Sequence, residues 1–125
     1  MILGLGVDVC PVERIEQILD RHGEIFSKRV FTEGELERAG TGLVMAERLA
    51  ARFAAKEATI KALGAPEGLG WRDMEVVSAA DGAPSLQLAG KADKRAKEMG
   101  VSRMFLSLSH AGGVAIAMVI LEGDK

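Results

Sequence analysis

The sequence predicts an α+β fold, in which a small and mostly antiparallel sheet packs against one long helix. Three observations lead to this prediction. Residues 43–64 are rich in the good helix formers Ala, Leu, Glu, Lys and Arg, which predicts a single long helix. Two pairs of short apolar runs follow it, and a glycine-containing turn joins each pair, as in β-hairpins. Strands that cluster late in the chain, apart from the long helix, favour an α+β arrangement over a doubly wound sheet.

Strand and helix signals alternate before the long helix. Residues 2–9, ILGLGVDV, are too short an apolar run for a helix and contain two glycines, which predicts a buried strand with close backbone packing. Apolar residues then recur at helical spacing as far as Gly23, which predicts a first helix. Thr32 with Glu35 matches a capping box and predicts a short helix over residues 33–39.

After Gly64 ends the long helix, the sequence indicates two hairpins and one surface helix. An Asp-Gly turn joins the first pair of strands, and Gly112-Gly113 joins the second pair. The segment between the hairpins carries charges on most faces, as a surface helix does. In chain order, these elements are expected at residues 71–79 (strand), 84–88 (strand), 91–99 (helix), 104–109 (strand) and 114–121 (strand).

The composition of the chain limits its size class, its partners and its cellular compartment. The chain has 125 residues, 48% hydrophobic and 27% charged, which predicts a single globular domain over residues 1–125. Its formal net charge of −2 argues against bulk attraction to nucleic acid or to an anionic membrane, so any anionic partner must be met locally. The single cysteine, Cys10, excludes an intrachain disulfide and a cysteine-based zinc cluster. With no visible signal peptide and no apolar stretch long enough to span a bilayer, we expect a soluble, cytoplasmic protein.

Two carboxylates stand in apolar surroundings. Asp8 is the only ionisable residue of the first strand, and Glu57 continues the apolar stripe of the long helix. A carboxylate on such a face is costly unless something neutralises it. Mg²⁺ is one solution, because it needs only one or two protein carboxylates beside substrate phosphates. The simpler alternatives, an aspartate that ends a strand and a Glu57–Lys61 pair at i, i+4, are favoured by spacing alone.

The long helix also carries a ridge of like charge. Arg48, Arg52 and Lys56 follow one another at i, i+4 and i+8, and none has an acidic residue three or four positions away. A phosphorylated ligand or an acidic protein surface would relieve their repulsion, and arginine suits bidentate phosphate contacts. The alternative is that these three residues form an ordinary charged, solvent-exposed face of the helix.

Further along, Ser109 and His110 lie beside a glycine turn. Adjacent strand side chains point to opposite faces, so these two residues do not form a nucleophile and base.

Together these segments resemble the 4′-phosphopantetheinyl transferases, specifically the small holo-acyl-carrier-protein synthases. The resemblance extends from residue 2 to about residue 122 and departs from the family pattern at Ala111 and in the loop 65–70. The segments that resemble family motifs are residues 4–9 with 13–15, 29–32 with 35–36, 52–58 with 61–64, 71–73 with 75–76, and 106–110.

The resemblance implies a fold, a reaction and a set of functional residues. The fold would be that of the 4′-phosphopantetheinyl transferases. The reaction would move the 4′-phosphopantetheine arm of coenzyme A to a serine of an apo acyl carrier protein, with Mg²⁺ as cofactor and adenosine 3′,5′-bisphosphate as product. Asp8 and Glu57 would be the metal ligands and, with Lys61, the catalytic residues. The resemblance leaves two candidates for the base that deprotonates the serine: Glu57 and a metal-bound water. Coenzyme contacts are expected at Arg52, Lys56, Lys61, Gly64, Ser109 and His110.

The resemblance also implies partners. The acidic carrier protein would dock on basic residues, for which Arg14, Arg21 and Arg48 are the candidates. A chain of this length would form a homotrimer with active sites between subunits, and neither nucleic acid nor membrane would be a partner. Two other classes of function stay open: a catalytically silent module that binds coenzyme A or a carrier protein, and a metal-dependent phosphohydrolase. Whether the carrier protein serves fatty acid or polyketide synthesis does not follow from the sequence.

Overall fold

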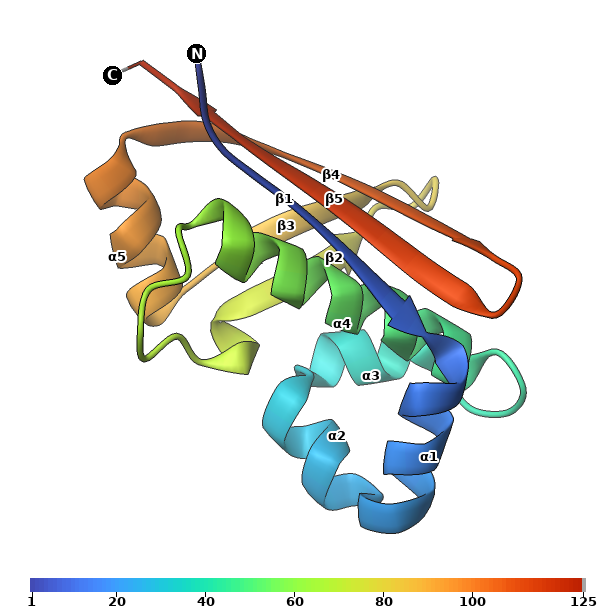
Figure 1. The fold of residues 1–125 in the computed structure, drawn as a ribbon. Coiled ribbons are helices and arrows are strands. Elements are labelled where there is room, and N and C mark those ends of the chain that lie inside the picture. The colour runs from blue at the N-terminus through green and yellow to red at the C-terminus, as the bar shows by residue number, and fades with distance from the viewer. Residues whose placement is uncertain (125) are drawn as a thin grey trace.

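The long helix α4 (Met45–Ala62) lies against one face of a three-stranded sheet, and the other helices gather at its two ends (Figure 1). The computed structural model describes residues 1–124. Besides α4 it contains the helices α1 (Val12–His22), α2 (Glu24–Val30), α3 (Glu33–Ala39) and α5 (Gly90–Met99), a 3₁₀ turn (Trp71–Asp73), and the strands β1 (Ile2–Pro11), β2 (Met74–Ser78), β3 (Pro84–Leu88), β4 (Val101–Ala111) and β5 (Val114–Gly123).

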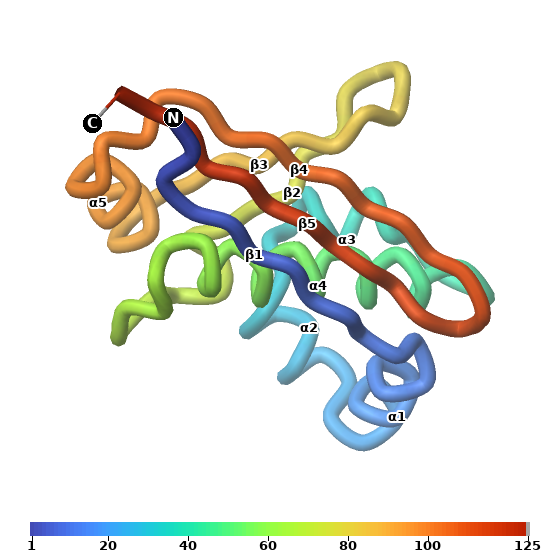
Figure 2. The backbone as a smooth tube through the Cα atoms, turned by 45° about the horizontal axis from the view of Figure 1, so that its top comes forward, coloured from blue at the N-terminus to red at the C-terminus, as the bar shows by residue number. Residues whose placement is uncertain are grey.

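The strands form two separate antiparallel sheets. The larger has the order β1-β5-β4, so the first strand of the chain pairs with the last (Figure 2). Its register aligns Asp8 with Ala117 and Leu108, and Cys10 with Ala115 and His110. The smaller sheet is the β2–β3 hairpin. Both predicted hairpins and the α+β class are therefore confirmed.

The structure corrects several predicted boundaries. Helix α2 was not predicted, because Gly23 ends α1 as expected but its φ of +49° also turns the chain directly into a second helix. The long helix begins at Met45 rather than at residue 43. The predicted strand 71–79 begins with a 3₁₀ turn, which leaves only Met74–Ser78 extended. The capping box at Thr32 and Glu35 is confirmed, with both of its hydrogen bonds present.

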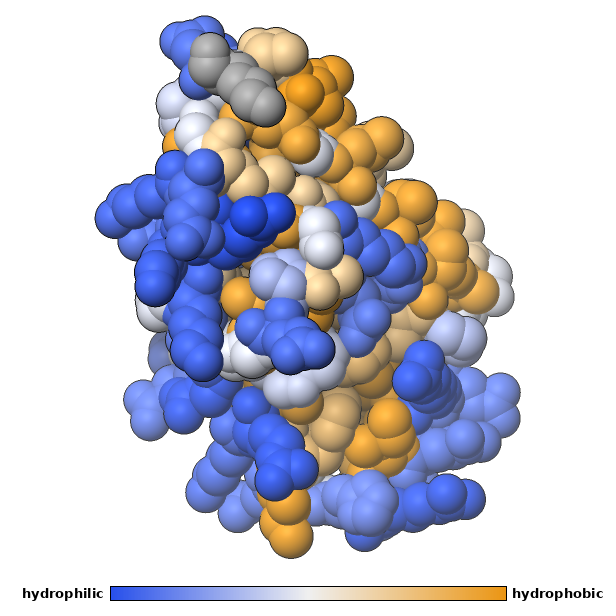
Figure 3. All heavy atoms as spheres, turned by 60° about the vertical axis from the view of Figure 1, so that its left-hand side comes forward, coloured by the Kyte–Doolittle hydropathy of each residue, from blue (hydrophilic) through white to orange (hydrophobic). Residues whose placement is uncertain are grey.

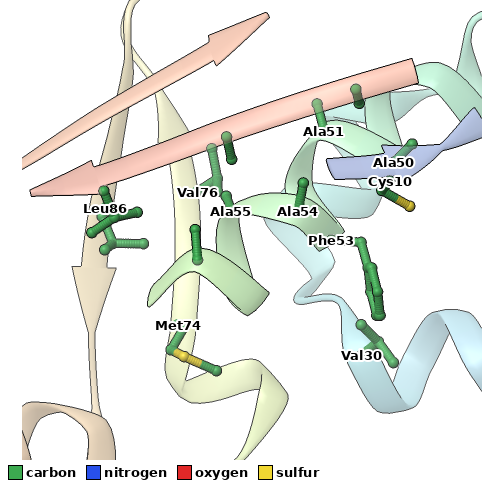
Figure 4. Packing of buried hydrophobic residues seen from close by; sticks show 14 of the residues in the cluster. Cys10, Val30, Ala50, Ala51, Phe53, Ala54, Ala55, Met74, Val76 and Leu86 are labelled. Carbon is green, nitrogen blue, oxygen red and sulfur yellow. The ribbon is translucent and has the colours of Figure 1, made fainter. Parts of the chain in front are cut away.

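Small side chains line the contact between α4 and the sheet. Ala115 and Ala117 of β5 are fully buried, and so are Ala54 and Ala58 of α4. In Figure 4 the alanines of α4 face the strands, whereas Phe53 points toward Val30 of α2. Because alanine adds little bulk, helix and strands approach closely along the whole contact.

Two glycines bring β1 closest to α4. A Cβ atom on Gly6 would lie 1.9 Å from the Ala58 carbonyl oxygen, and one on Gly4 would lie 2.1 Å from the Ala62 carbonyl oxygen. Neither distance is physically possible, so any side chain would force the strand off the helix. Since alternate strand residues share a face, Asp8 is the next residue on the face that carries Gly4 and Gly6. Its carboxylate reaches Lys61 of α4 at 3.1 Å.

A buried ion pair joins α4 to α3 and β2. Lys56 Nζ lies 2.7 Å from Glu35 Oε1, and neither side chain has any exposed surface. Lys56 also donates to the carbonyls of Trp71 and Met74, while Glu35 accepts the Thr32 and Val76 amides. Burial lowers the pKa of Lys56, and the neighbouring Glu35 opposes that shift. A buried pair this well satisfied costs about 3–5 kcal/mol when one partner is removed.

Among residues 1–124 there is no helix that is both long enough and apolar enough to cross a membrane.

The glycine contact leads to a stability prediction. Gly6→Ala should lower the free energy of unfolding by at least about 2 kcal/mol, because the new methyl group overlaps the helix backbone and β1 must shift. Chemical denaturation followed by circular dichroism measures this change. Gly34→Ala is the matched control, since its Cβ would meet side-chain atoms alone, the movable Glu75 carboxylate at 2.9 Å and Thr32 Oγ1 at 3.9 Å, and it should stay within about 1 kcal/mol of wild type. Equal effects of the two substitutions would contradict the close contact at Gly6.

Candidate active site

Asp8 on β1 and Glu57 on α4 are linked through Lys61, which pairs with Asp8 and stands one helical turn after Glu57. The Asp8 side chain is 17% exposed, and its Oδ1 lies 3.1 Å from Lys61 Nζ. Glu57 is half-buried, and it makes neither an ion pair nor a side-chain hydrogen bond with any residue in the described range 1–124. Burial raises the pKa of the Cys10 thiol; Arg14 opposes this rise, and Asp8 and Glu57 both add to it. Both carboxylates thus act in the same direction on the pKa of this buried thiol.

Two carboxylates suit a hard cation whose remaining ligands are water molecules and substrate oxygens. The site offers two carboxylates, and residues 1–124 contain no group of three or more His, Cys, Asp or Glu side chains that could enclose a metal. Mg²⁺ commonly takes one or two protein carboxylates and completes its shell with water and substrate phosphate oxygens. The free Glu57 carboxylate, half-buried without a partner, is the group that a cation would neutralise. The residues present therefore fit Mg²⁺.

Lys61 and Gly64 lie at the C-terminal end of α4. The Lys61 ammonium donates to Asp8 and, at 3.1 Å, to the Val7 carbonyl, and its side chain is 53% exposed. Gly64 follows the helix with a φ of +84°, so it makes the turn into the loop toward α5. The structure thus places the predicted trio Asp8, Glu57 and Lys61 together, with Gly64 just beyond.

Three of the other predicted coenzyme contacts, Arg52, Ser109 and His110, line a cavity on a different side of α4. This cavity has a volume of about 390 Å³ and lies between the start of α4, the end of β4 and the β2–β3 hairpin. Its polar lining comes from Arg38, Glu47, Arg48, Arg52, Ser78, Ser109 and His110. Four of these side chains are cationic or can become so, which suits an anionic ligand.

Arg52 is the best-anchored cation of this cavity. It is only 6% exposed, and it donates to the Arg48 carbonyl at 3.1 Å and to Ser78 Oγ at 3.4 Å. Its Nε is buried and has no partner among residues 1–124, so one donor is left unsatisfied. Burial lowers the pKa of the Arg52 guanidinium, and Arg48 contributes to the lowering. His110 Nε2 lies 3.5 Å from Glu47 Oε1 across the cavity.

The two groups of residues stand at opposite edges of the sheet. Asp8 belongs to the edge strand β1 and His110 to the edge strand β4, with β5 between them. Neighbouring strands are spaced about 4.8 Å apart, so the two edges are separated by about 10 Å. One chain therefore presents the carboxylates on one side and the cationic cavity on the other.

Lys56 does not belong to either group. The sequence led us to expect a coenzyme contact, but its ammonium is fully buried and contacts three oxygen atoms of the protein. The structure corrects this expectation to a structural role. The ridge of like charge has an acidic partner after all, since Glu35 is distant in sequence and only the fold brings it to Lys56.

The three predicted docking arginines do not share one surface. Arg14 and Arg21 are exposed on α1, and the Arg14 guanidinium lies 5.9 Å from the centre of the Phe53 ring, which stacks on Trp71. Arg48 instead lines the cavity, where its Nη1 donates to the Ala39 carbonyl at 3.4 Å. The sequence gives no local sign that Arg38 and Glu47 line this cavity, because only the folded chain brings α3 and the first turn of α4 to the same cavity as the end of β4.

Comparison with known proteins places the chain in a family. The model of the 4′-phosphopantetheinyl transferase superfamily matches residues 4–119. The holo-[acyl-carrier-protein] synthase of Anaeromyxobacter dehalogenans strain 2CP-C is 53% identical over 126 residues, covering 98% of each chain.

Solved structures show the same similarity. The structure of holo-[acyl-carrier-protein] synthase from Neisseria meningitidis superimposes with a TM-score of 0.87 at 32% identity and covers 98% of this chain and 99% of that one. The synthase from Bacillus anthracis, solved in complex with CoA (3′,5′-ADP), gives a TM-score of 0.80 at 35% identity, with 99% of both chains covered. The chain therefore belongs to the holo-[acyl-carrier-protein] synthases, enzymes of the 4′-phosphopantetheinyl transferase superfamily.

Proposed function

We propose that this chain transfers the 4′-phosphopantetheine arm of coenzyme A to a serine hydroxyl of an apo acyl carrier protein, in a Mg²⁺-dependent reaction that releases adenosine 3′,5′-bisphosphate. The observation that carries the proposal is that Asp8 of β1 lies 3.1 Å from Lys61 of α4, one helical turn after Glu57, whose carboxylate is unpaired within residues 1–124. The names of the relatives support the carrier protein as acceptor, and the Bacillus anthracis complex supports coenzyme A as donor.

The residues of the site take distinct roles in this reaction. Asp8 and Glu57 would hold Mg²⁺, which supplies positive charge opposite the coenzyme diphosphate when it is bound. The serine oxygen attacks the phosphorus that carries the pantetheine arm, the diphosphate bond breaks, and the serine proton is lost. Glu57, a carboxylate without a protein partner, is the candidate acceptor for that proton. Lys61, half-exposed beside Asp8, can neutralise the leaving phosphate.

The cationic cavity would bind the nucleotide end of coenzyme A. Arg52 keeps one buried donor free, and Arg48, Ser109 and His110 line the same space. Coenzyme A carries several phosphates, and guanidinium groups bind phosphate oxygens with good geometry. Gly64 makes the positive-φ turn just after Lys61, and we expect the coenzyme to approach the backbone there.

An exposed apolar face supports a trimer with active sites between subunits. The outer face of the β1-β5-β4 sheet exposes Leu5, Val7, Val9, Phe105, Ile116 and Met118, each by 41% or more. Figure 3 shows apolar surface gathered along the side of the molecule that carries the sheet. Such a patch marks an interface in a protein of this kind. In a homotrimer, the carboxylates at the β1 edge of one subunit would face the cationic cavity at the β4 edge of the next.

The donor and the acceptor both belong to the interior of the cell, so we propose a cytoplasmic location. Cell fractionation with an antibody against the chain would test it.

We further propose that Arg14 and Arg21 on α1 dock the acidic carrier protein beside the aromatic pair Phe53 and Trp71.

Carrier modification tests the reaction directly. With coenzyme A and Mg²⁺, intact mass spectrometry of a panel of apo carrier proteins should show the mass gain of one phosphopantetheine arm. Glu57→Gln and Asp8→Asn should each lower kcat/KM at least about 100-fold, since each removes charge from the site where phosphate charge develops. Glu98→Gln on α5 is the matched control and should behave as wild type.

The outcomes of this assay separate the alternatives. Coenzyme binding without mass gain on any carrier would indicate a silent binding module. Release of adenosine bisphosphate without an acceptor would indicate a phosphohydrolase. Full activity of Glu57→Gln at limiting Mg²⁺ would remove Glu57 from the site.

Mixing two inactive variants tests whether active sites form between subunits. Glu57→Gln damages the carboxylate side and His110→Ala damages the cavity side. If each site combines both sides from different chains, co-expression in equal amounts should restore up to about a quarter of wild-type activity, because that share of interfaces pairs two intact sides. If mixing restores nothing while each variant alone still assembles, then both sides of a site come from one chain.

Charge reversal on α1 tests the docking surface. Arg14→Glu should raise the KM for the carrier protein at least about fivefold at low ionic strength, and the wild-type KM should rise steeply with salt. Lys94→Glu on α5 carries the same change of charge and should leave the KM unchanged. An unaltered KM in Arg14→Glu would place the docking surface elsewhere.

A further inference from the structure

The Asp8 carboxylate already has a cationic partner within its own chain. Lys61 Nζ lies 3.1 Å from Asp8 Oδ1 and donates a second hydrogen bond to the Val7 carbonyl, also at 3.1 Å. The carboxylate is mostly covered, at 17% exposure, whereas the lysine side chain remains 53% exposed. The ammonium can therefore leave toward solvent without any movement of the backbone.

Of the two carboxylates of the site, Asp8 alone has a cationic partner within residues 1–124. Lys61 stands one turn after Glu57 on α4, at the i, i+4 spacing at which helical pairs form. It nevertheless pairs with Asp8 on the strand, and Glu57 has no ion-pair partner within residues 1–124. The strand carboxylate is thus neutralised in the ligand-free chain, while the helix carboxylate is not.

We infer that Lys61 is the resident counter-ion of Asp8 and exchanges with the divalent cation when the enzyme binds its ligands. The inference rests on the proposed cation site at Asp8 and Glu57. An ammonium and a divalent cation cannot both stay close to Asp8 without repulsion, so the two compete for its oxygens. The displaced ammonium is then free to contact phosphate oxygens of the coenzyme. Lys61 accordingly opposes cation binding before coenzyme A arrives and supports the bound complex afterwards.

This exchange predicts opposite effects of one substitution on binding and on catalysis. Without coenzyme, Lys61→Met should tighten Mn²⁺ binding at least about threefold, measured by the EPR signal of free Mn²⁺, because the competing cation is gone. The same variant should transfer phosphopantetheine more slowly than wild type. Lys61→Arg keeps the positive charge and should retain the weak Mn²⁺ binding of wild type. Circular dichroism checks that each variant is folded.

A substitution at Arg14 distinguishes direct exchange at Asp8 from a general electrostatic effect of removing positive charge. Arg14 acts electrostatically on the same Cys10 thiol as Asp8 and Glu57, but it makes no ion pair with Asp8. Arg14→Gln should therefore tighten Mn²⁺ binding less than Lys61→Met. Equal tightening in both variants, or none in Lys61→Met, would overturn the exchange.

The cation site itself is tested in the same titration. If Asp8→Asn and Glu57→Gln both leave Mn²⁺ affinity unchanged, the site lies elsewhere and the metal part of the proposed function fails, whatever Lys61 does. If both weaken binding and only Lys61→Met has no effect, the cation site stands and the exchange alone is wrong.

Discussion

The structure depends on the contact between the backbones of β1 and α4. Gly4 and Gly6 have no side chains, and any Cβ at either position would overlap a carbonyl oxygen of the helix. This approach fixes both the separation and the register of strand and helix, so that Asp8 reaches Lys61, one helical turn after Glu57. A site built from one strand and one helix needs such a fixed distance, because carboxylates that share a cation must be held within a few tenths of an ångström.

Other contacts keep α4 from rotating about its own axis. The buried pair of Lys56 and Glu35 ties one side of the helix to α3 and β2, and alanines fill the opposite side against β5. With these two sides fixed, Glu57 and Lys61 face β1, and Arg48 and Arg52 face the cavity. The fold thus separates the carboxylates from the cations that would bind the same coenzyme, and the apolar outer face of the sheet offers the means to bring copies of the chain together.

Local patterns in the sequence predict much of this arrangement. Several features act over a few residues and can be recognised from the sequence alone: the capping box at Thr32, the hairpin turns and the helix-forming composition around α4. Asp8 and Glu57 stand out because they are charged in apolar stretches. The partner of Lys56 could not be predicted, since Glu35 meets it only through tertiary packing, and nothing local distinguishes a buried lysine from a ligand-binding one. The pairing of β1 with β5 depends on long-range contacts in the same way.

The central claim is that the glycine contact creates one cation site from Asp8 and Glu57. A crystal structure of the protein with coenzyme A and Mn²⁺, recorded at a wavelength where manganese scatters anomalously, tests it most directly. We expect one anomalous peak per subunit, within bonding distance of a carboxylate oxygen from Asp8 and another from Glu57 of the same chain. A peak that is bound by only one of them, or by other residues, would show that Asp8 and Glu57 do not form one cation site.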